Sequence, residues 1–216
     1  MAERPVFIPT EAAPFSRAVP VRFVWNGGFA RSQKQKNIVA IHEGFRRKFP
    51  EKNVLEISSK SLQELGVSLS AFNLTKYVPS LGRSVPVECV YQGGKVFSGG
   101  GPFTELYGGT PKAAKTDPRL AESGVLCEFF FEGEHMPLSP KTAFYNWLYI
   151  NALMEHPEYS EQLLQYDGFT DIEFIPDAGV SCQADAAAVF VALHRAGRLE
   201  QCRGYEGYCA AVSGRV

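Results

Sequence analysis

The stretch Glu88-Cys-Val-Tyr-Gln-Gly-Gly-Lys-Val-Phe97 carries the densest chemical pattern of the chain and sets how the rest is expected to fold around it. At helical pitch, Glu88, Gln92 and Lys95 lie at i, i+4 and i+7, which places them in one narrow stripe with Tyr91 alongside. A carboxylate, an amide and an amine thus share one face of a segment that is otherwise suited to burial. We interpret that face as the wall of a pocket.

Paired glycines interrupt this stretch. Gly93 and Gly94 would each cost roughly 1 kcal/mol inside a helix, so they indicate a place where another backbone or a ligand comes very close. Val90 and Phe97 would point away from the stripe, into a core. The same spacing of charges is typical of an ordinary solvated helix face, whereas the Gly-rich and aromatic residues that follow, 97–107, favour the pocket wall. These residues alone leave both interpretations open.

Composition limits the classes of function. The 216 residues carry a net charge of −1, so no broad polyanion-binding surface is expected, only a local basic pocket. The five cysteines are odd in number and form no CxxC pair, which indicates free thiols in a reducing cytoplasm, and the four scattered histidines have no metal-ligand spacing. No apolar run is long enough to span a bilayer. We expect a cytoplasmic protein with no membrane segment, no metal and no cofactor.

The remaining pattern predicts a helix-rich α+β fold with small sheets. A loose, proline-rich arm is expected over residues 1–20 and a polar, peripheral tail over 198–216. Alternating or apolar runs predict strands at 21–25, 53–58, 67–74, 85–88, 125–131 and 171–174. Capping residues and apolar spacing predict helices that begin at Ser32, within 104–123, at Ser139-Pro140, at Pro157 and at Ser181.

The first of these helices carries a candidate ligand site. Arg31, Ser32 and Lys34 surround a helix start, where backbone amides and the positive dipole favour a phosphate. A simple cap by Ser32 explains the same residues. Trp25 lies shortly before them, where it would stack on a base or, as is commoner for tryptophan, fill a core.

Short motifs in a fixed order resemble the NADAR (YbiA-like) family. They read Ser70-Ala-Phe-Asn73, Glu88-x-x-Tyr91-Gln92-x-x-Lys95 and Pro111-Lys-Ala-Ala-Lys115. Trp147–Met154, Gln162–Leu164 and Asp171–Phe174 echo the later elements of the family. The resemblance covers about residues 67–197, and the first third of the chain has no counterpart in the short members.

This resemblance implies both a fold and an activity. It implies a YbiA-like multihelical catalytic domain over 67–197, preceded by an N-terminal α/β extension over 1–66 that reads strand-helix-strand and followed by the tail at 198–216. Members are N-glycosidases that act on ribosyl–nitrogen bonds. Some process riboflavin-pathway intermediates. Others remove ADP-ribose from guanine and are paired with DarT-type toxins that attach it to DNA.

Cleavage of an N-glycosidic bond needs a proton on the departing nitrogen and a stabilised anomeric carbon. The resemblance implies Lys95 as the covalent nucleophile, because a desolvated, neutral amine forms a Schiff base with an opened ribose. It implies Glu88 as the acid/base, two helical turns or about 10 Å away. A Glu–Lys pair that merely neutralises itself is the structural alternative.

A ligand-binding set is implied around these two residues. Gln92 and Asn73 would position the ribose, and Tyr91 and Phe72 would line the pocket. Asp171 or Glu173 would supply a further carboxylate, although a charged strand edge explains this pair as well. These assignments are expectations that follow from the resemblance.

The end of the chain departs from the family pattern. Short members carry a Trp-x-Asp element and an Asn-x-Leu-Gly helix start, whereas this chain reads Asp177-Ala-Gly-Val-Ser-Cys-Gln-Ala-Asp185. Gln183 is still placed to meet a phosphate or a ribose. The extra first third suits a substrate larger than a riboflavin precursor, which favours ADP-ribosyl-guanine in DNA.

Different classes of function remain after this step. The favoured one is an ADP-ribosyl-guanine hydrolase that serves as antitoxin to a DarT-type toxin. The alternatives are an N-glycosidase for a riboflavin-pathway ribosylamino intermediate and a non-catalytic module that binds ADP-ribose or the toxin.

Overall fold

The N-terminal residues form a sheet that also takes in a strand from far along the chain. The computed structural model describes residues 1–140, 142–174 and 182–213. Its largest sheet has the order β2 (Ser16–Phe23), β1 (Ala2–Pro9), β9 (Gly168–Thr170) and β3 (Val54–Glu56). The β1–β2 and β1–β9 pairs are antiparallel, and β3 runs parallel to β9.

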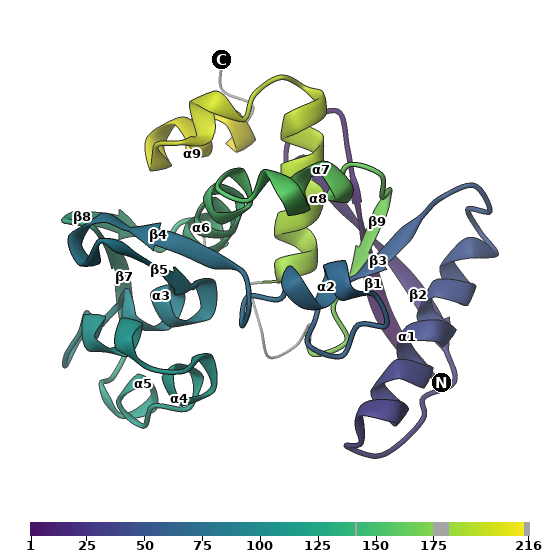
Figure 1. Cartoon of the computed structure of the whole chain (residues 1–216), viewed down its shortest axis with the longest axis horizontal. Helices are drawn as coiled ribbons and strands as arrows, with labels where there is room; N and C mark the ends of the chain where they lie inside the picture. Colours follow the sequence, from purple (N-terminus) through teal and green to yellow (C-terminus); the bar gives the residue numbers. More distant parts are fainter. Residues whose placement is uncertain (141, 175–181, 214–216) are drawn as a thin grey trace.

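Alternation along β1 gives the two faces of this sheet different partners. Val6 and Ile8 join the apolar cluster formed with α1 (Arg31–Arg46), whereas Phe7 packs against the main core that includes α8 (Gln183–Arg195). Successive side chains of a strand point to opposite faces, so the sheet is covered by α1 on one face and by α8 on the other (Figure 1).

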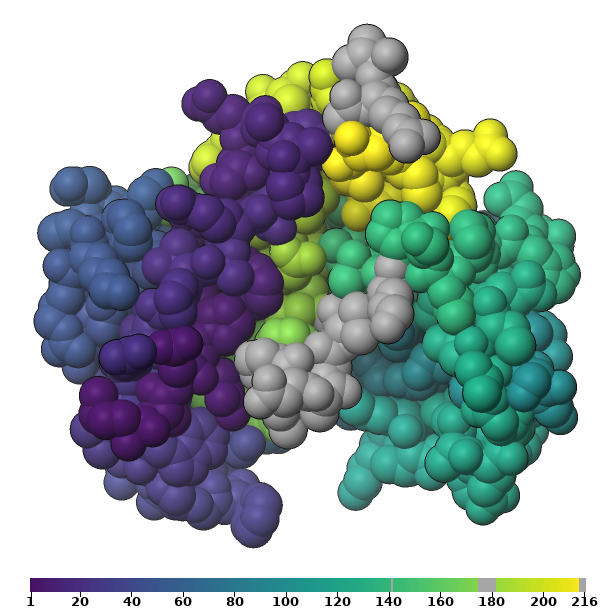
Figure 2. Space-filling view, turned by 180° about the vertical axis from the view of Figure 1, so that it is seen from behind, coloured from purple at the N-terminus to yellow at the C-terminus, as the bar shows by residue number. Residues whose placement is uncertain are grey.

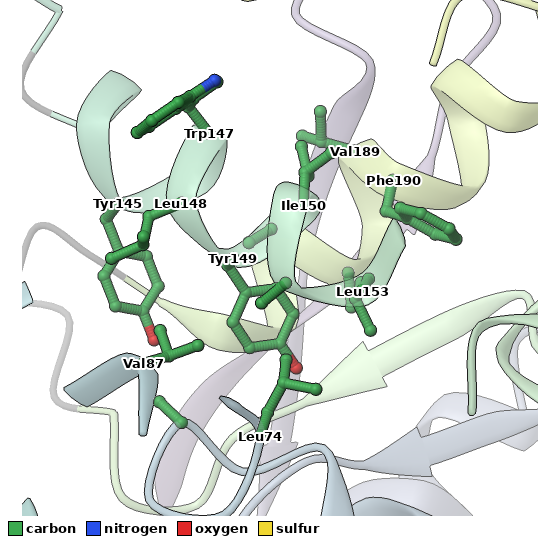
Figure 3. Close-up of a cluster of buried hydrophobic side chains, with 14 of the residues drawn as sticks. Leu74, Val87, Tyr145, Trp147, Leu148, Tyr149, Ile150, Leu153, Val189 and Phe190 are labelled. Atoms are coloured by element: carbon green, nitrogen blue, oxygen red, sulfur yellow. The ribbon is translucent and has the colours of Figure 1, made fainter. Parts of the chain in front are cut away.

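The main core surrounds one strongly apolar helix, α6 (Ala143–Met154), in which every residue from Ala143 to Leu153 is buried. It packs against α8, α3 (Val87–Gly93) and β4 (Thr75–Val78). Figure 3 shows Tyr145 and Tyr149 of this helix pointing toward Val87 and Leu74. The Tyr149 hydroxyl donates to the Leu69 carbonyl oxygen at 2.6 Å, so the buried hydroxyl is satisfied.

Small elements complete the structure around this core. One small sheet pairs β4 with β5 (Arg83–Pro86), and another has the order β6 (Lys95–Phe97), β7 (Leu126–Phe131) and β8 (Glu134–Pro137). The remaining helices are short: α2 (Glu64–Ser68), α4 (Pro111–Lys115), α5 (Arg119–Glu122), α7 (Pro157–Leu163) and α9 (Tyr205–Ser213), with 3₁₀ turns at Pro79–Leu81, Thr104–Gly108 and Glu200–Cys202. Seen from behind, α8 lies between the N-terminal sheet region and the teal residues of the middle of the chain (Figure 2).

The predicted helix-rich α+β class is confirmed, and helices are present within 104–123 and at Pro157 as expected. The helix expected to begin at Ser139-Pro140 begins later, at Ala143. The loose arm predicted for residues 1–20 is wrong, because β1 and β2, each of eight residues, pair there as an antiparallel hairpin. Its alternation is obscured by prolines, and Pro5 and Pro20 face each other in the register. The peripheral tail is also wrong in part, because Tyr205 and Tyr208 of α9 are buried in the main core.

Local corrections concern the ends of elements. Helix α1 begins after Ala30 with no side-chain cap, so Ser32 is not its cap. The strand predicted at 171–174 is wrong: β9 ends at Thr170. The cap predicted at Ser181 lies outside the described residues, and α8 begins after Cys182. The domain boundaries expected near residues 66 and 197 remain predictions.

The most important correction concerns the opening stretch. Helix α3 ends at Gly93, and Lys95 begins strand β6 opposite Phe129. A Cβ on Gly93 would lie 2.9 Å from the Phe103 carbonyl oxygen, and a Cβ on Gly94 would lie 2.6 Å from the Phe130 carbonyl oxygen. The paired glycines therefore admit two neighbouring backbones, as expected, and the chain turns at this point instead of continuing as a helix.

Candidate active site

A cavity of about 470 Å³ lies where the N-terminal sheet region meets the helical part of the chain. Its volume falls within the range typical of small-molecule sites. Segments that are distant in sequence contribute to it: the end of β3, the turn before β4, helices α3, α4 and α6, the segment after β9 and the start of α8. The lining residues are Ser58, Ser59, Lys60, Ser70, Ala71, Phe72, Glu88, Tyr91, Gln92, Lys115, Tyr145, Asp171, Glu173, Phe174 and Gln183.

A chain of hydrogen bonds runs along the α3 wall of this cavity. Lys95 Nζ donates to Gln92 Oε1 at 2.6 Å, and Gln92 Nε2 donates to Glu88 Oε1 at 2.9 Å. Lys115 Nζ, from α4, lies 3.6 Å from the same Glu88 oxygen. Glu88 and Gln92 are buried. The amide therefore orders the amine and the carboxylate relative to each other.

This chain of hydrogen bonds crosses from a helix to a strand. Glu88 and Gln92 lie one helical turn apart on α3. Helix α3 ends at Gly93, and Lys95 reaches Gln92 from the start of β6. Lys95 is not one of the residues that line the cavity, but it contacts Gln92 and Tyr91, which are.

Lys95 is half-buried beside aromatic side chains. Its Nζ lies 4.7 Å from the centroid of the Tyr91 ring. That ring packs against Phe129 and Tyr145, with ring centroids 5.6 Å and 4.9 Å away. Burial lowers the pKa of Lys95 from 10.5 to about 8; the Glu88 charge opposes this change and the Lys115 charge adds to it. A substantial fraction of the amine is thus neutral near pH 8.

The opposite wall is built around Gln183, the first residue of α8. Its Oε1 accepts from the Ala71 amide at 2.8 Å, and its Nε2 donates to the Ile57 carbonyl oxygen at 2.7 Å. It also forms a hydrogen bond with the carboxyl group of Asp171. Gln183 therefore fastens the end of β3, the turn before β4 and the segment after β9 to one another.

Asp171 lines this wall and has the carboxyl group of Glu56, which does not line the cavity, as a charged neighbour. Glu56 is buried and accepts hydrogen bonds from Ser58 Oγ and Thr170 Oγ1, both at 2.6 Å, and from the Ile172 amide at 2.9 Å. Burial raises the pKa of Glu56. Burial, together with the neighbouring Glu56 charge, raises the pKa of Asp171 from 3.8 to about 8. Near neutral pH, Asp171 is therefore mostly protonated and able to donate a hydrogen bond.

A comparison with family models identifies the family to which the NADAR-like motifs of this sequence belong. Residues 2–215 match the model described as the DarT1-associated NADAR antitoxin. The chain belongs to the DarT1-associated NADAR antitoxin family. The match includes the first third of the chain, which the motif resemblance over residues 67–197 did not cover. A comparison with curated proteins found no match.

Sequence reasoning predicted most of the residues on the α3 wall and some on the opposite wall. Phe72, Glu88, Tyr91, Gln92, Asp171 and Gln183 all line the cavity, as does Glu173. Asn73 lies outside the lining, and its side-chain amide donates to the Val67 carbonyl oxygen at 2.8 Å. The catalytic and binding roles of these residues remain predictions.

The candidate phosphate site at the start of α1 is not part of the cavity lining. Arg31 and Ser32 are exposed. Lys34 lies closer, because its Nζ is 3.5 Å from Oε1 of Glu173, which lines the cavity. Among the described residues, Lys34 is the one member of this predicted phosphate site that contacts a residue lining the cavity.

Sequence reasoning missed several lining residues of this NADAR protein. Lys115 stood within a quoted motif but received no role, although it pairs with Glu88. Ser58, Ser59 and Lys60 directly follow β3, and a polar run at the end of a buried strand is a usable signal for a site. Glu56 is a charged residue within an otherwise apolar strand, which is a second signal.

Within residues 1–140, 142–174 and 182–213, no helix is both long enough and apolar enough to cross a bilayer. No group of three or more His, Cys, Asp or Glu side chains in them is placed to hold a metal ion.

Proposed function

We propose that this protein is an N-glycosidase that removes ADP-ribose from guanine bases in DNA and thereby acts as the antitoxin of a DarT-type toxin. The observation that carries the proposal is the Lys95 amine, with its pKa brought to about 8 and its Nζ joined through Gln92 to buried Glu88. Such a pair supplies a nucleophile and an acid/base within one hydrogen-bonded unit. Membership in an antitoxin family associated with DarT1 supports the biological role.

The reaction begins with attack by the neutral Lys95 amine on the anomeric carbon of the ribose. The bond between that carbon and the guanine nitrogen breaks, and Glu88 in its acid form gives its proton to the departing nitrogen. The new amine–carbon bond becomes a protonated Schiff base as the ribose ring opens, and the proton that the lysine nitrogen loses goes to the ring oxygen. Glu88, now a base, takes a proton from water, which adds to the Schiff base and releases ADP-ribose with the free lysine.

The other lining residues suit the remainder of the ligand. Lys60 and Lys115 carry positive charge for the diphosphate, and Phe72 presents a ring for stacking. Protonated Asp171 donates a hydrogen bond to an acceptor of the ligand, either on the base or on the ribose. Gln183 holds Asp171 in place. The described cysteines are all free, which suits a cytoplasmic antitoxin.

Reductive trapping tests the proposal directly. A guanosine that carries ADP-ribose, placed in a short single-stranded oligodeoxynucleotide, is incubated with the protein with and without borohydride. We expect release of ADP-ribose without borohydride and a reduced covalent adduct on Lys95 with it, located by peptide mass spectrometry. Tight binding with neither release nor adduct would identify a binding module instead. Release from a ribosylamino metabolite alone would identify a metabolite glycosidase.

Co-expression tests the antitoxin role in cells. A DarT-type toxin is expressed with the wild-type protein, with Lys95→Arg or with the matched surface variant Lys112→Arg, which changes an exposed lysine of α4. We expect growth with wild type and Lys112→Arg and arrest with Lys95→Arg. Rescue by Lys95→Arg would show that protection does not require the amine.

A further inference from the structure

The loop between β2 and α1, residues 24–30, exposes several large apolar side chains. Phe29 is 101% exposed, Val24 is 71% exposed and Trp25 is 38% exposed. Clustered exposed aromatic groups on a soluble domain mark binding surfaces. We call residues 24–30 the aromatic loop.

The aromatic loop is anchored at its base. The buried side chain of Asn37, on α1, accepts from the Asn26 backbone amide at 2.7 Å and donates to the Asn26 carbonyl oxygen at 3.0 Å. These bonds fix the middle of the loop to the helix. Trp25 also rests against Phe23 of β2, with ring centroids 6.0 Å apart. The aromatic groups are therefore presented on a fixed base, which lowers the entropy lost when a ligand stacks on them.

Two cations flank the tryptophan. Arg4 Cζ lies 5.5 Å and Lys34 Nζ lies 5.9 Å from the centroid of the Trp25 ring. An exposed aromatic ring beside a guanidinium and an ammonium group provides both a stacking face for a base and charge for the neighbouring phosphate. The net charge of −1 for the whole chain means that attraction at this place is local.

This surface is continuous with the candidate active site. Lys34 Nζ lies 3.5 Å from Oε1 of Glu173, and both Glu173 and Phe174 line the cavity. Phe174 also packs against Phe7 of β1, with ring centroids 6.2 Å apart, and so joins the rim of the cavity to the strand that carries Arg4.

We infer that the aromatic loop binds unpaired bases of the strand that flanks the modified guanine. This inference rests on the proposed function and adds to it the surface that holds the flanking strand. Stacking on Trp25 and Phe29 tolerates any base, which suits an enzyme that meets modified guanines in varied sequence. Paired bases in a duplex do not offer their faces to these rings.

Kinetics on two substrates test the inference. Release of ADP-ribose is measured from the free ADP-ribosylated guanosine and from the same nucleoside in the middle of a single-stranded oligodeoxynucleotide. We expect Trp25→Ala/Phe29→Ala to lower kcat/KM for the oligonucleotide by about tenfold or more, while kcat/KM for the nucleoside stays within about twofold of wild type. Phe29→Ala alone, which removes a fully exposed ring, should give part of the loss without any effect on folding. Tyr77→Ala, which truncates a half-exposed ring on β4, is the matched control.

Several outcomes would overturn the inference. Equal activity of wild type and the double variant on the oligonucleotide, or equal losses on both substrates, would show that the loop does not bind the strand. Unchanged oligonucleotide kinetics together with loss of binding to purified DarT-type toxin would show that the surface binds protein instead.

Binding of an unmodified strand separates failure of this inference from failure of the proposed function. A fluorescently labelled, unmodified single-stranded oligonucleotide is titrated with the full chain and followed by anisotropy. We expect binding that weakens by about tenfold or more in Trp25→Ala/Phe29→Ala. If wild type binds in this way yet releases no ADP-ribose from either substrate, the glycosidase proposal fails and the strand surface stands. If wild type releases ADP-ribose but the variant binds the strand as tightly as wild type, the strand surface fails alone.

Discussion

The two walls of the cavity hold their acidic groups in opposite ways. On the α3 wall, Glu88 lies 3.6 Å from the ammonium group of Lys115 and receives a hydrogen bond from Gln92. On the opposite wall, Asp171 has another carboxyl group, that of Glu56, as its charged neighbour. Burial beside a second carboxyl group favours the protonated form of Asp171.

The same physical cause acts on Lys95 and Asp171 with opposite sign. Burial removes water from both groups and disfavours the charged form of each, so the pKa of the lysine falls to about 8 and the pKa of the aspartic acid rises to about 8. Near that pH, a neutral amine and a neutral acid coexist in one site. The α3 wall, with its neutral amine, therefore suits attack on a sugar carbon, and the opposite wall, with its neutral acid, suits donation of a hydrogen bond to a ligand.

Removal of the amine should produce the largest effect. Lys95→Arg keeps a positive charge near Tyr91 but has no neutral amine to attack the sugar, because a guanidinium stays protonated. We expect kcat/KM for ADP-ribose release to fall by at least about 10³-fold. Lys112→Arg serves as the control, and circular dichroism checks the fold. Activity within tenfold of wild type would exclude Lys95 as the nucleophile.

Replacing the carboxyl group of Glu88 by an amide should produce the second largest effect. We expect Glu88→Gln to lower kcat by about 10²–10⁴-fold because proton transfer to the leaving nitrogen is lost. The Glu88 charge raises the pKa of Lys95, so its removal should also shift the acidic limb of the remaining activity to lower pH. Both quantities come from a pH series of initial rates. A loss of activity with no movement of that limb would separate Glu88 from the amine.

The dependence of activity on pH tests whether Lys95 and Asp171 both have a pKa of about 8. Activity should rise as pH increases toward about 8, because the amine of Lys95 loses its proton, and should fall above about 8, because Asp171 loses the proton it donates. We expect a decline of about tenfold per pH unit on either side. Asp171→Asn retains a donor and should abolish the alkaline decline. A decline that persists in this variant would assign it to another group.

The smallest effect concerns stability. Between pH 3.8 and about 8, folded Asp171 keeps a proton that the unfolded chain has lost, so this residue makes the fold progressively less stable as pH rises through that window. Asparagine has no such proton. Asp171→Asn should therefore be neutral near pH 4 and raise the free energy of unfolding by at least about 1 kcal/mol near pH 7.5. Urea denaturation at both pH values measures this difference.

Glu161→Gln, on the exposed side of α7, is the matched control for that measurement. It should change the free energy of unfolding by less than about 0.5 kcal/mol at both pH values. An equal gain in stability in Asp171→Asn at pH 4 and pH 7.5 would show that the pKa of Asp171 is not raised in the folded protein.

The sequence alone determined the contacts between residues that are close together in the chain. Glu88 and Gln92 lie one helical turn apart, so their hydrogen bond follows from helix geometry alone, and the paired glycines after them announced a close backbone contact. The apolar run of α6 identified the core helix in the same way. Motif order was sufficient to indicate the family that the match over residues 2–215 establishes.

The tertiary structure alone decided the rest, because it depends on contacts between residues far apart in the chain. The hairpin of β1 and β2 is stabilised by a sheet that includes β9, which no local pattern reveals. Glu56 and Asp171 lie more than a hundred residues apart, and only folding places one carboxyl group beside the other and removes water from both. Lys95 likewise begins a strand because β7, far along the chain, supplies its partner Phe129.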